Sequence, residues 1–257
     1  MALIRVGFFS EVLGMCTSCD VILPQPQSAD EPVRLLPTLV LLHSYSKRHD
    51  AWQRMTGIER YAHAYNTAVI MPDAQQSSYT DMCYGGRFFT HIADELLPAM
   101  RAFFPLSNRR EDNFIAGCSM GGYGALKIGI SRPDCFSCIG SLSAGHISYR
   151  GLISGKDDRG MSVEYMTFGD VGPEVEKEEF HRRATAIVAS GKNIPRIFIS
   201  CGQQDPLLLE NARNTRDYFR SFEGNPFAFE YTEFPGTHNW NYWDEHIRDF
   251  FRFVFRE

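Results

Sequence analysis

The chain has 257 residues and a formal net charge of −5 at pH 7, with 44% hydrophobic and 22% charged residues. This length suits one α/β domain built around a single large core. The acidic balance provides no positive field to attract phosphate, which argues against a nucleic-acid partner. No apolar run approaches the roughly 20 residues needed to span a bilayer, so no membrane partner is expected.

The N-terminal residues contain no apolar stretch followed by a small-residue cleavage site, so no signal peptide is predicted. The seven cysteines are an odd number, which favours free thiols and, with the missing leader, a cytoplasmic protein. Two C-x-x-C pairs, Cys16/Cys19 and Cys135/Cys138, could form a zinc or redox site. They lie far apart in the sequence and border predicted strands, so core packing is the preferred interpretation, and no metal or cofactor is predicted.

Apolar runs define the first elements of the chain. Residues 5–11 and 21–24 predict a β-hairpin. Residues 37–43 and 67–72 are continuous apolar runs, typical of strands buried on both faces. Residues 51–65, between them, predict a helix, and residues 94–104 carry apolar side chains at helical spacing up to Pro105.

The second half of the chain continues to alternate between strands and helices. In chain order, the predicted elements are strand 113–116, helix 123–130, strands 138–143 and 196–200, helix 211–222, strand 227–234 and helix 242–253. Aromatic residues lie on one face of the last helix and predict core packing or a contact between subunits of a homo-oligomer. The alternation predicts an α/β fold with a mostly parallel central sheet and helices on both faces.

One stretch fits this alternation poorly. Residues 146–194 are charged and rich in glycine, and we expect an insertion there within a single domain covering residues 1–257. The insertion is either a small cap near the active-site face or a surface excursion without function.

The most informative motif is Gly-Cys-Ser-Met-Gly-Gly at residues 117–122. It contains the G-x-S-x-G pattern of the nucleophile elbow, in which a serine stands on a sharp turn between a strand and a helix. Glycines flank such a turn because a Cβ there would collide with the neighbouring backbone. The predicted strand before Ser119 and the predicted helix after it favour the elbow over a plain glycine-rich turn.

A serine nucleophile needs an adjacent base, normally a histidine that a carboxylate orients. In this fold the expected order along the chain is Ser, acid, His. His238 follows the last predicted strand on a loop, whereas His246 falls inside the terminal helix and His181 precedes the expected acid. Asp205 follows the buried strand 196–200 and is the predicted acid; the alternative is a solvated turn aspartate.

The oxyanion hole is expected to use the backbone N–H of Met120, the residue after the nucleophile. A second N–H should come from the loop that follows the early strand 37–43, at residues 43–46.

Together, these residues carry a resemblance that runs nearly end to end. The chain resembles the esterase D / S-formylglutathione hydrolase group of α/β-hydrolases, and most closely the bacterial tributyrin esterases. The matching segments are Leu41-Leu42-His43 with Trp52, Met71-Pro72, Tyr79-Thr80-Asp81, Tyr84-Gly85, Glu95-Leu96-Leu97-Pro98, Phe104-Pro105, the elbow with Tyr123-Gly124, Cys201-Gly202 with Asp205, and Gly236-Thr237-His238 with Trp240 and Trp243.

The resemblance implies an α/β-hydrolase with Ser119, Asp205 and His238 as a catalytic triad and with Met120 and Tyr45 as oxyanion donors. The family usually has His-Gly where this chain has His43-Ser44, so either Ser44 or Tyr45 could supply the second donor; Tyr45 is preferred.

The predicted activity is that of a metal-free serine carboxylesterase on small esters with short acyl chains. Tyr45, Tyr84 and Trp240 are candidates to line the substrate pocket, although ordinary packing would also explain each of them. The alternatives are hydrolysis of S-formylglutathione or of acetylated or feruloylated plant sugars. A non-catalytic binding protein with a hydrolase fold is the alternative from a different class.

Overall fold

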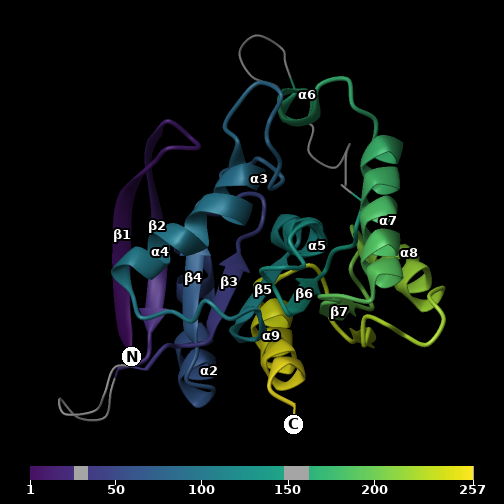
Figure 1. Ribbon diagram of the computed structural model, residues 1–257. Helices are drawn as coiled ribbons and strands as arrows, with labels where there is room; N and C mark the ends of the chain where they lie inside the picture. Colours follow the sequence, from purple (N-terminus) through teal and green to yellow (C-terminus); the bar gives the residue numbers. More distant parts are fainter. Residues whose placement is uncertain (26–33, 148–161, 257) are drawn as a thin grey trace.

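The computed structural model describes residues 1–25, 34–147 and 162–256. The strands in this part of the chain are β1 (Ala2–Ser10), β2 (Met15–Leu23), β3 (Thr38–Leu42), β4 (Ala68–Pro72), β5 (Asn113–Cys118), β6 (Cys138–Leu142), β7 (Arg196–Gly202) and β8 (Glu230–Phe234). They form one sheet in the order β1-β2-β4-β3-β5-β6-β7-β8 (Figure 1). The predicted strands are all present, although the last one begins at Glu230 and not at residue 227.

The sheet is mostly parallel, as predicted. β1 and β2 form an antiparallel hairpin, and β2 pairs antiparallel to β4. From β4 onwards every neighbouring pair is parallel. All residues of β3, β4, β5 and β6 are buried, which explains their continuous apolar sequences.

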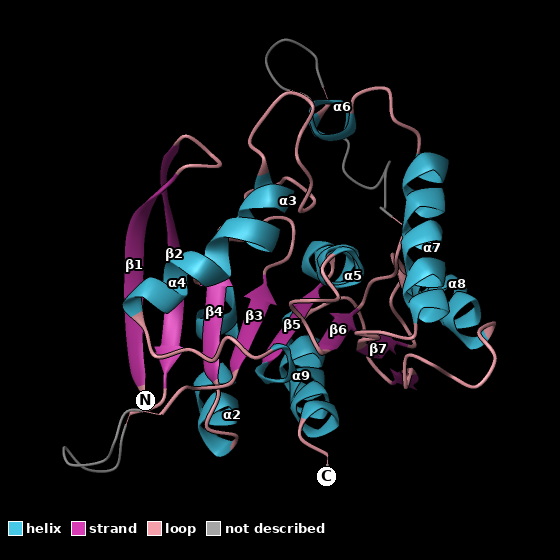
Figure 2. Cartoon of the chain, in the orientation of Figure 1, coloured by secondary structure: helices cyan, strands magenta, loops and turns pink. Residues whose placement is uncertain are grey.

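Helices cover both faces of the sheet (Figure 2). The described helices are α1 (Ala51–Met55), α2 (Ile58–Ala64), α3 (Phe88–Thr90), a π-helical turn (His91–Glu95), α4 (Leu96–Phe103), a 3₁₀ turn (Arg110–Asp112), α5 (Met120–Ser131), α6 (Val163–Phe168), α7 (Pro173–Ser190), α8 (Leu209–Arg220) and α9 (Trp240–Val254). One core cluster joins the sheet to α4, α5, α7 and α8, and the other joins it to α1, α2 and α9. None of the helices in the described part of the chain is long and apolar enough to cross a membrane.

The prediction of a single helix over residues 51–65 is wrong, because the helix is interrupted between α1 and α2. Thr56 has extended backbone angles, and the N–H of Gly57 donates to the Asp244 carboxylate of α9 at 2.7 Å. A tertiary contact to the end of the chain therefore interrupts the helical pattern.

The helix predicted from residue 94 begins earlier, at Phe88, and passes through a π-helical turn. Its first half carries buried polar groups, and His91 Nδ1 lies 2.6 Å from Glu95 and 3.1 Å from Ser10 of β1. Because these buried positions are polar, the first half of the helix lacks the apolar periodicity by which a helix is predicted from sequence.

The range predicted as an insertion, residues 146–194, is only partly described, because residues 148–161 lie outside the described ranges. Its described part contains α6, on the side of the sheet toward which β3 and β5 point, and α7, an 18-residue helix that the sequence reading missed (Figure 2). Helix signals were present. Pro173 starts α7, Gly191 ends it with a left-handed φ of 62°, and its buried residues follow helical spacing.

The aromatic stripe of the C-terminal helix packs into the core of the same chain. Tyr242, Trp243, Phe250, Phe251 and Phe253 of α9 are all buried. Core packing, one of the two interpretations of this stripe, is therefore confirmed.

Candidate active site

Ser119 occupies a sharp turn between β5 and α5. Its backbone has φ 54° and ψ −121°, a strained conformation for a residue with a side chain. A Cβ on Gly117 would lie 2.5 Å from the backbone of Gly121, and a Cβ on Gly121 would lie 2.3 Å from the carbonyl oxygen of Leu42. The flanking glycines are thus required by close backbone approach, and the turn has the geometry of a nucleophile elbow.

The structure brings Ser119, His238 and Asp205 into one hydrogen-bonded chain. His238 Nε2 lies 2.9 Å from Ser119 Oγ, and His238 Nδ1 lies 2.8 Å from Asp205 Oδ2. Because a carboxylate accepts hydrogen bonds, Nδ1 carries a proton and donates it to Asp205. Nε2 is then free to accept the hydroxyl proton of Ser119.

Asp205 is held as a buried, ionised carboxylate. Its Oδ1 accepts hydrogen bonds from the N–H groups of Leu207 at 2.9 Å and Leu208 at 3.0 Å. Burial raises the pKa of Asp205, but the hydrogen bonds from His238, Leu208 and Leu207 outweigh it, so the pKa lies below its ordinary value. The carboxylate therefore stays charged while it orients His238, and the solvated-turn interpretation of Asp205 does not apply.

Two loops at the carboxyl edge of the sheet are tied together, and this brings the acid and the base side by side. The N–H of Gln204 donates to the carbonyl of Gly236 at 2.9 Å, and a Cβ on Gly202 would lie 2.4 Å from that same oxygen. The loop after β7 therefore packs directly on the loop after β8. Trp243 of α9 presents its ring edge-on to His238, with 5.1 Å between ring centroids.

The rival histidines lie elsewhere. His246, in α9, contacts Asp249 at 2.8 Å and stacks on Phe234. His181, in α7, lies 2.9 Å from His146. Neither contacts Ser119, so His238 is the histidine that the structure places at the nucleophile.

The backbone of the loop after β3 is fixed by side-chain hydrogen bonds. The hydroxyl of Tyr79 donates to the carbonyl of His43 at 3.0 Å. His43 Nδ1 lies 2.8 Å from the carbonyl of Ser44, which also accepts from the N–H of Lys47 at 3.1 Å. Burial lowers the pKa of His43, so the ring is neutral and its Nε2 accepts from the N–H of Ala74 at 3.0 Å.

These bonds determine where the N–H of Tyr45 points. In a planar trans peptide the N–H is directed opposite to the C=O, so the Tyr45 N–H faces away from the groups that bind the Ser44 carbonyl. Within the described residues, neither this N–H nor that of Met120 donates a hydrogen bond to another backbone group. Ser44 is buried and is not among the residues with positive φ, so this position does not require the left-handed backbone conformation that favours glycine.

Ser119 and His238 open into a cavity of about 370 Å³, the active-site cavity. Of the predicted substrate-binding residues, Tyr45 and Trp240 line this cavity, whereas Tyr84 does not. Tyr84 is exposed and stacks on Tyr165 with 5.7 Å between ring centroids. The lining residues that sequence reasoning missed are Ser46, Lys47, Leu207, Leu208, Asn239 and Trp243. Trp243 belongs to the segments that carry the family resemblance, and Ser46 to the loop expected to supply the second oxyanion donor. For the other four, proximity in sequence to Tyr45, Asp205 and His238 was the available signal.

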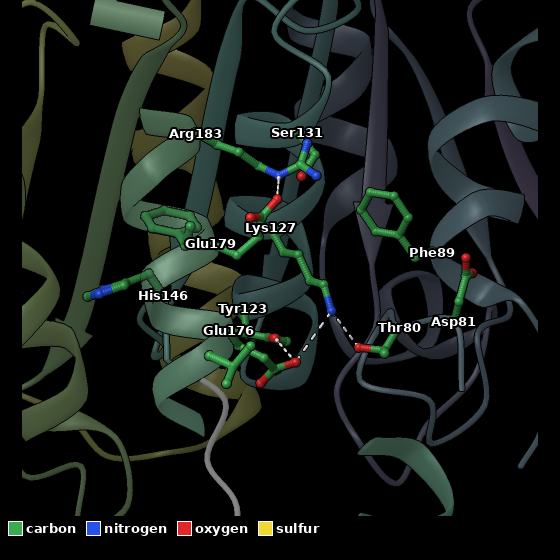
Figure 3. A pocket seen from close by; sticks show the side chains of 12 residues that line it. Thr80, Asp81, Phe89, Tyr123, Lys127, Ser131, His146, Glu176, Glu179 and Arg183 are labelled. Carbon is green, nitrogen blue, oxygen red and sulfur yellow. Dashed lines mark hydrogen bonds and ion pairs between the residues drawn. The ribbon is translucent and has the colours of Figure 1, made fainter. Parts of the chain in front are cut away.

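A different cavity of about 330 Å³, the α5–α7 cavity, is lined mainly by side chains of α5, α7 and the loop after β4 (Figure 3). Lys127 points into it and lies 2.6 Å from the hydroxyl of Thr80 and 3.7 Å from the carboxylate of Glu176. Neither Ser119 nor His238 lines this cavity. The ammonium group of Lys127 is therefore already paired with protein groups, through its contacts with Thr80 and Glu176.

All seven cysteines are free thiols. Cys19 and Cys138 are buried, as core packing predicts, whereas Cys16 is exposed and Cys135 is half-buried. In the described ranges, no group of three or more His, Cys, Asp and Glu side chains could hold a metal ion.

Comparison with known proteins identifies the family and the fold of the chain. The family model of esterases, described as "Putative esterase", matches residues 10–253. The chain belongs to this esterase family. It is 30% identical over 265 residues to an acetyl esterase of Caldicellulosiruptor saccharolyticus, and the match covers 99% of this chain and 98% of the relative.

Two solved structures show the fold of this esterase. The fluorophosphonate-binding serine hydrolase FphF of Staphylococcus aureus superposes with a TM-score of 0.88 at 32% identity, covering 100% of this chain and 99% of that one. The S-formylglutathione hydrolase FrmB of the same organism gives a TM-score of 0.80 at 32% identity, with 98% of each chain covered. The protein therefore has the predicted α/β-hydrolase fold and is a serine esterase by family.

Proposed function

We propose that the protein hydrolyses short-chain carboxylic esters, with Ser119 as nucleophile, His238 as general base and Asp205 as the residue that orients His238. The observation that carries the proposal is the continuous hydrogen-bonded chain from Asp205 to His238 to Ser119, with distances of 2.8 Å and 2.9 Å. In this geometry the base contacts the nucleophile before any substrate is bound.

The reaction proceeds in two halves. As Ser119 Oγ forms a bond with the ester carbonyl carbon, its proton moves to His238 Nε2. The N–H groups of Met120 and Tyr45 stabilise the resulting oxyanion. The bond to the alcohol then breaks, and the alcohol leaves with the proton from Nε2. A water molecule gives a proton to the same nitrogen and attacks the acyl carbon. The bond to Ser119 Oγ then breaks, Nε2 returns the proton to Oγ, and the acid is released.

Aromatic side chains line the active-site cavity and suit an apolar acyl group. Tyr45, Trp240 and Trp243 surround a volume of about 370 Å³ beside Ser119. The name of the Caldicellulosiruptor relative, acetyl esterase, is consistent with a short acyl chain. We extend the proposal to a cytoplasmic location, because free thiols are typical of a reducing compartment.

The test combines chemical labelling with kinetics. A fluorophosphonate probe should label the wild-type protein but not Ser119→Ala, and turnover of p-nitrophenyl butyrate should fall by about 10³-fold or more in that variant. Ser131→Ala, which removes a serine at the far end of α5, is the matched control and should retain both properties. Esterase activity that survives in Ser119→Ala would contradict the proposal, and a folded wild type that takes no label would support a binding protein.

Substrate preference is measured separately with acetate, butyrate, octanoate, ferulate and S-formylglutathione. We expect the highest kcat/KM for the acetate or butyrate esters, in line with the name of the acetyl esterase relative. A preference for octanoate would contradict the short-chain assignment, and a preference for the thioester would redirect it to S-formylglutathione hydrolysis.

A further inference from the structure

A larger, open cavity of about 510 Å³ adjoins the active-site cavity; we call it the adjoining cavity. Tyr45, Ser46 and Lys47 line both cavities, so these residues form the boundary between them. A substrate at Ser119 that is long enough to pass Tyr45 would therefore reach the adjoining cavity.

Three segments build the adjoining cavity. The loop after β3 contributes Lys47 and Arg48, the loop after β4 contributes Gln75 and Gln76, and α6 supplies an apolar wall that includes Met166. The carbonyl of Met166 accepts a hydrogen bond from the N–H of Tyr84 at 2.9 Å, which fixes α6 to the loop before α3.

The charged side chains that line the active-site cavity and the adjoining cavity are positive, whereas the whole protein has a negative net charge. The chain carries a net charge of −5, yet none of the described residues that line these two neighbouring cavities is acidic, and Lys47 and Arg48 are both positive. Arg48 has a partner, because its guanidinium lies 3.4 Å from the Asp50 carboxylate. Across the described ranges, the ammonium group of Lys47 has neither a hydrogen bond nor an ion pair, unlike that of Lys127 in the α5–α7 cavity.

The glutamine loop is held in an unusual conformation. Gln75, Ser78 and Tyr79 have φ values of 48°, 51° and 50°, which are costly for residues with side chains. The N–H of Gln75 donates to Asp73 at 2.9 Å, and Tyr79 donates to the carbonyl of His43. The loop that presents the two amides is therefore locked onto the loop that presents Tyr45. Strain of this kind is concentrated at ligand-binding sites.

We propose that the adjoining cavity binds an anionic group of the substrate, a carboxylate on the part of the ester remote from the scissile bond, with Lys47 as the specificity-determining cation. The amides of Gln75 and Gln76 provide further hydrogen-bond donors for the same group. This inference rests on the proposed esterase function, and it narrows the substrate class to esters that carry a carboxylate.

The test uses two pairs of substrates that differ only in charge. In 3-acetoxybenzoate and 3-acetoxybenzamide the variable group is on the alcohol part, and in monophenyl adipate and phenyl adipamate it is on the acyl part. We expect kcat/KM to favour the carboxylate by about five-fold in one pair at low ionic strength, as for a partly exposed ion pair. The pair that shows the preference identifies which part of the ester enters the adjoining cavity. The preference should decrease in 0.5 M NaCl because salt screens exposed charges.

The matched variants are Lys47→Gln and Lys192→Gln, each of which removes one exposed lysine. Lys192 follows α7, near the start of β7 and away from both cavities. The carboxylate preference should disappear in Lys47→Gln, persist in Lys192→Gln and be retained in Lys47→Arg. An equal preference in wild type and Lys47→Gln, or no preference in either pair, would overturn the inference.

Different outcomes test the esterase function and the carboxylate preference. If wild type hydrolyses the neutral amides and Ser119→Ala does not, the esterase function stands whatever the charge preference. If wild type hydrolyses p-nitrophenyl butyrate but none of the four esters, only this inference fails; if it hydrolyses none of these five esters, the proposed function fails as well.

Discussion

Gly121→Ala is the substitution that most directly tests how the elbow is built. A Cβ at this position would lie 2.3 Å from the carbonyl oxygen of Leu42 and 2.8 Å from that of His43. Both are backbone atoms at the end of β3, where the loop that presents Tyr45 begins. The added methyl group therefore pushes apart the two segments that carry the proposed oxyanion donors.

The size of the effect follows from this overlap. Cβ atoms essentially never approach other heavy atoms closer than 3.0 Å, so α5 and β3 must separate by at least about 0.7 Å. Misplacement of catalytic groups by about 1 Å costs on the order of 100-fold in rate. Overpacking of this kind also destabilises a fold by about 1–3 kcal/mol, which for a chain of this size lowers Tm by about 2–12 °C.

The assay compares kcat/KM for p-nitrophenyl butyrate and Tm between wild type, Gly121→Ala and Gly7→Ala. Gly7 lies in β1 with no atom within 4 Å of an added Cβ, so its alanine variant controls for the substitution itself. We expect a decrease of about 100-fold in kcat/KM for Gly121→Ala and less than two-fold for Gly7→Ala. A folded Gly121→Ala protein within three-fold of wild type would refute the steric reasoning.

Three further predictions follow from the same contacts. Asp205→Asn should lower kcat by about 10⁴-fold, because the amide can donate to His238 Nδ1 and hold the wrong tautomer; retention of a tenth of wild-type kcat would refute this role. Ser44→Gly should change kcat/KM by less than about three-fold, since Ser44 has no positive φ that a glycine would relieve; a gain of ten-fold or more would show that serine strains the loop. Burial, together with nearby His181 and Lys177, lowers the pKa of His146 to about 3. The unfolded chain therefore binds a proton that the folded protein does not, and stability should fall by about 2 kcal/mol between pH 7 and pH 5. Urea unfolding at both pH values should show a smaller loss for His146→Asn, and an equal loss would exclude His146 as the cause.

Local patterns were sufficient at the elbow and in the fully buried strands, although they did not lead to α7. The glycines around Ser119 predicted the elbow because their spacing reflects a backbone approach within a few residues. The fully buried strands were visible as continuous apolar runs. The same approach failed where a distant contact decides the local structure, as at Gly57, whose partner Asp244 lies near the other end of the chain.

The sequence by itself determined the fold class, the family and the identity of Ser119, Asp205 and His238 as candidates, because chain order and motif spacing carry that information. Only the tertiary structure decided that Asp205, His238 and Ser119 form one hydrogen-bonded chain, and that Tyr84 lies outside the active-site cavity. It also placed Lys47 and Gln75 at one cavity, although the two residues belong to loops after different strands. Parallel strands bring their carboxyl ends to one edge of the sheet, so residues remote in sequence meet there, and no local pattern records which of them do.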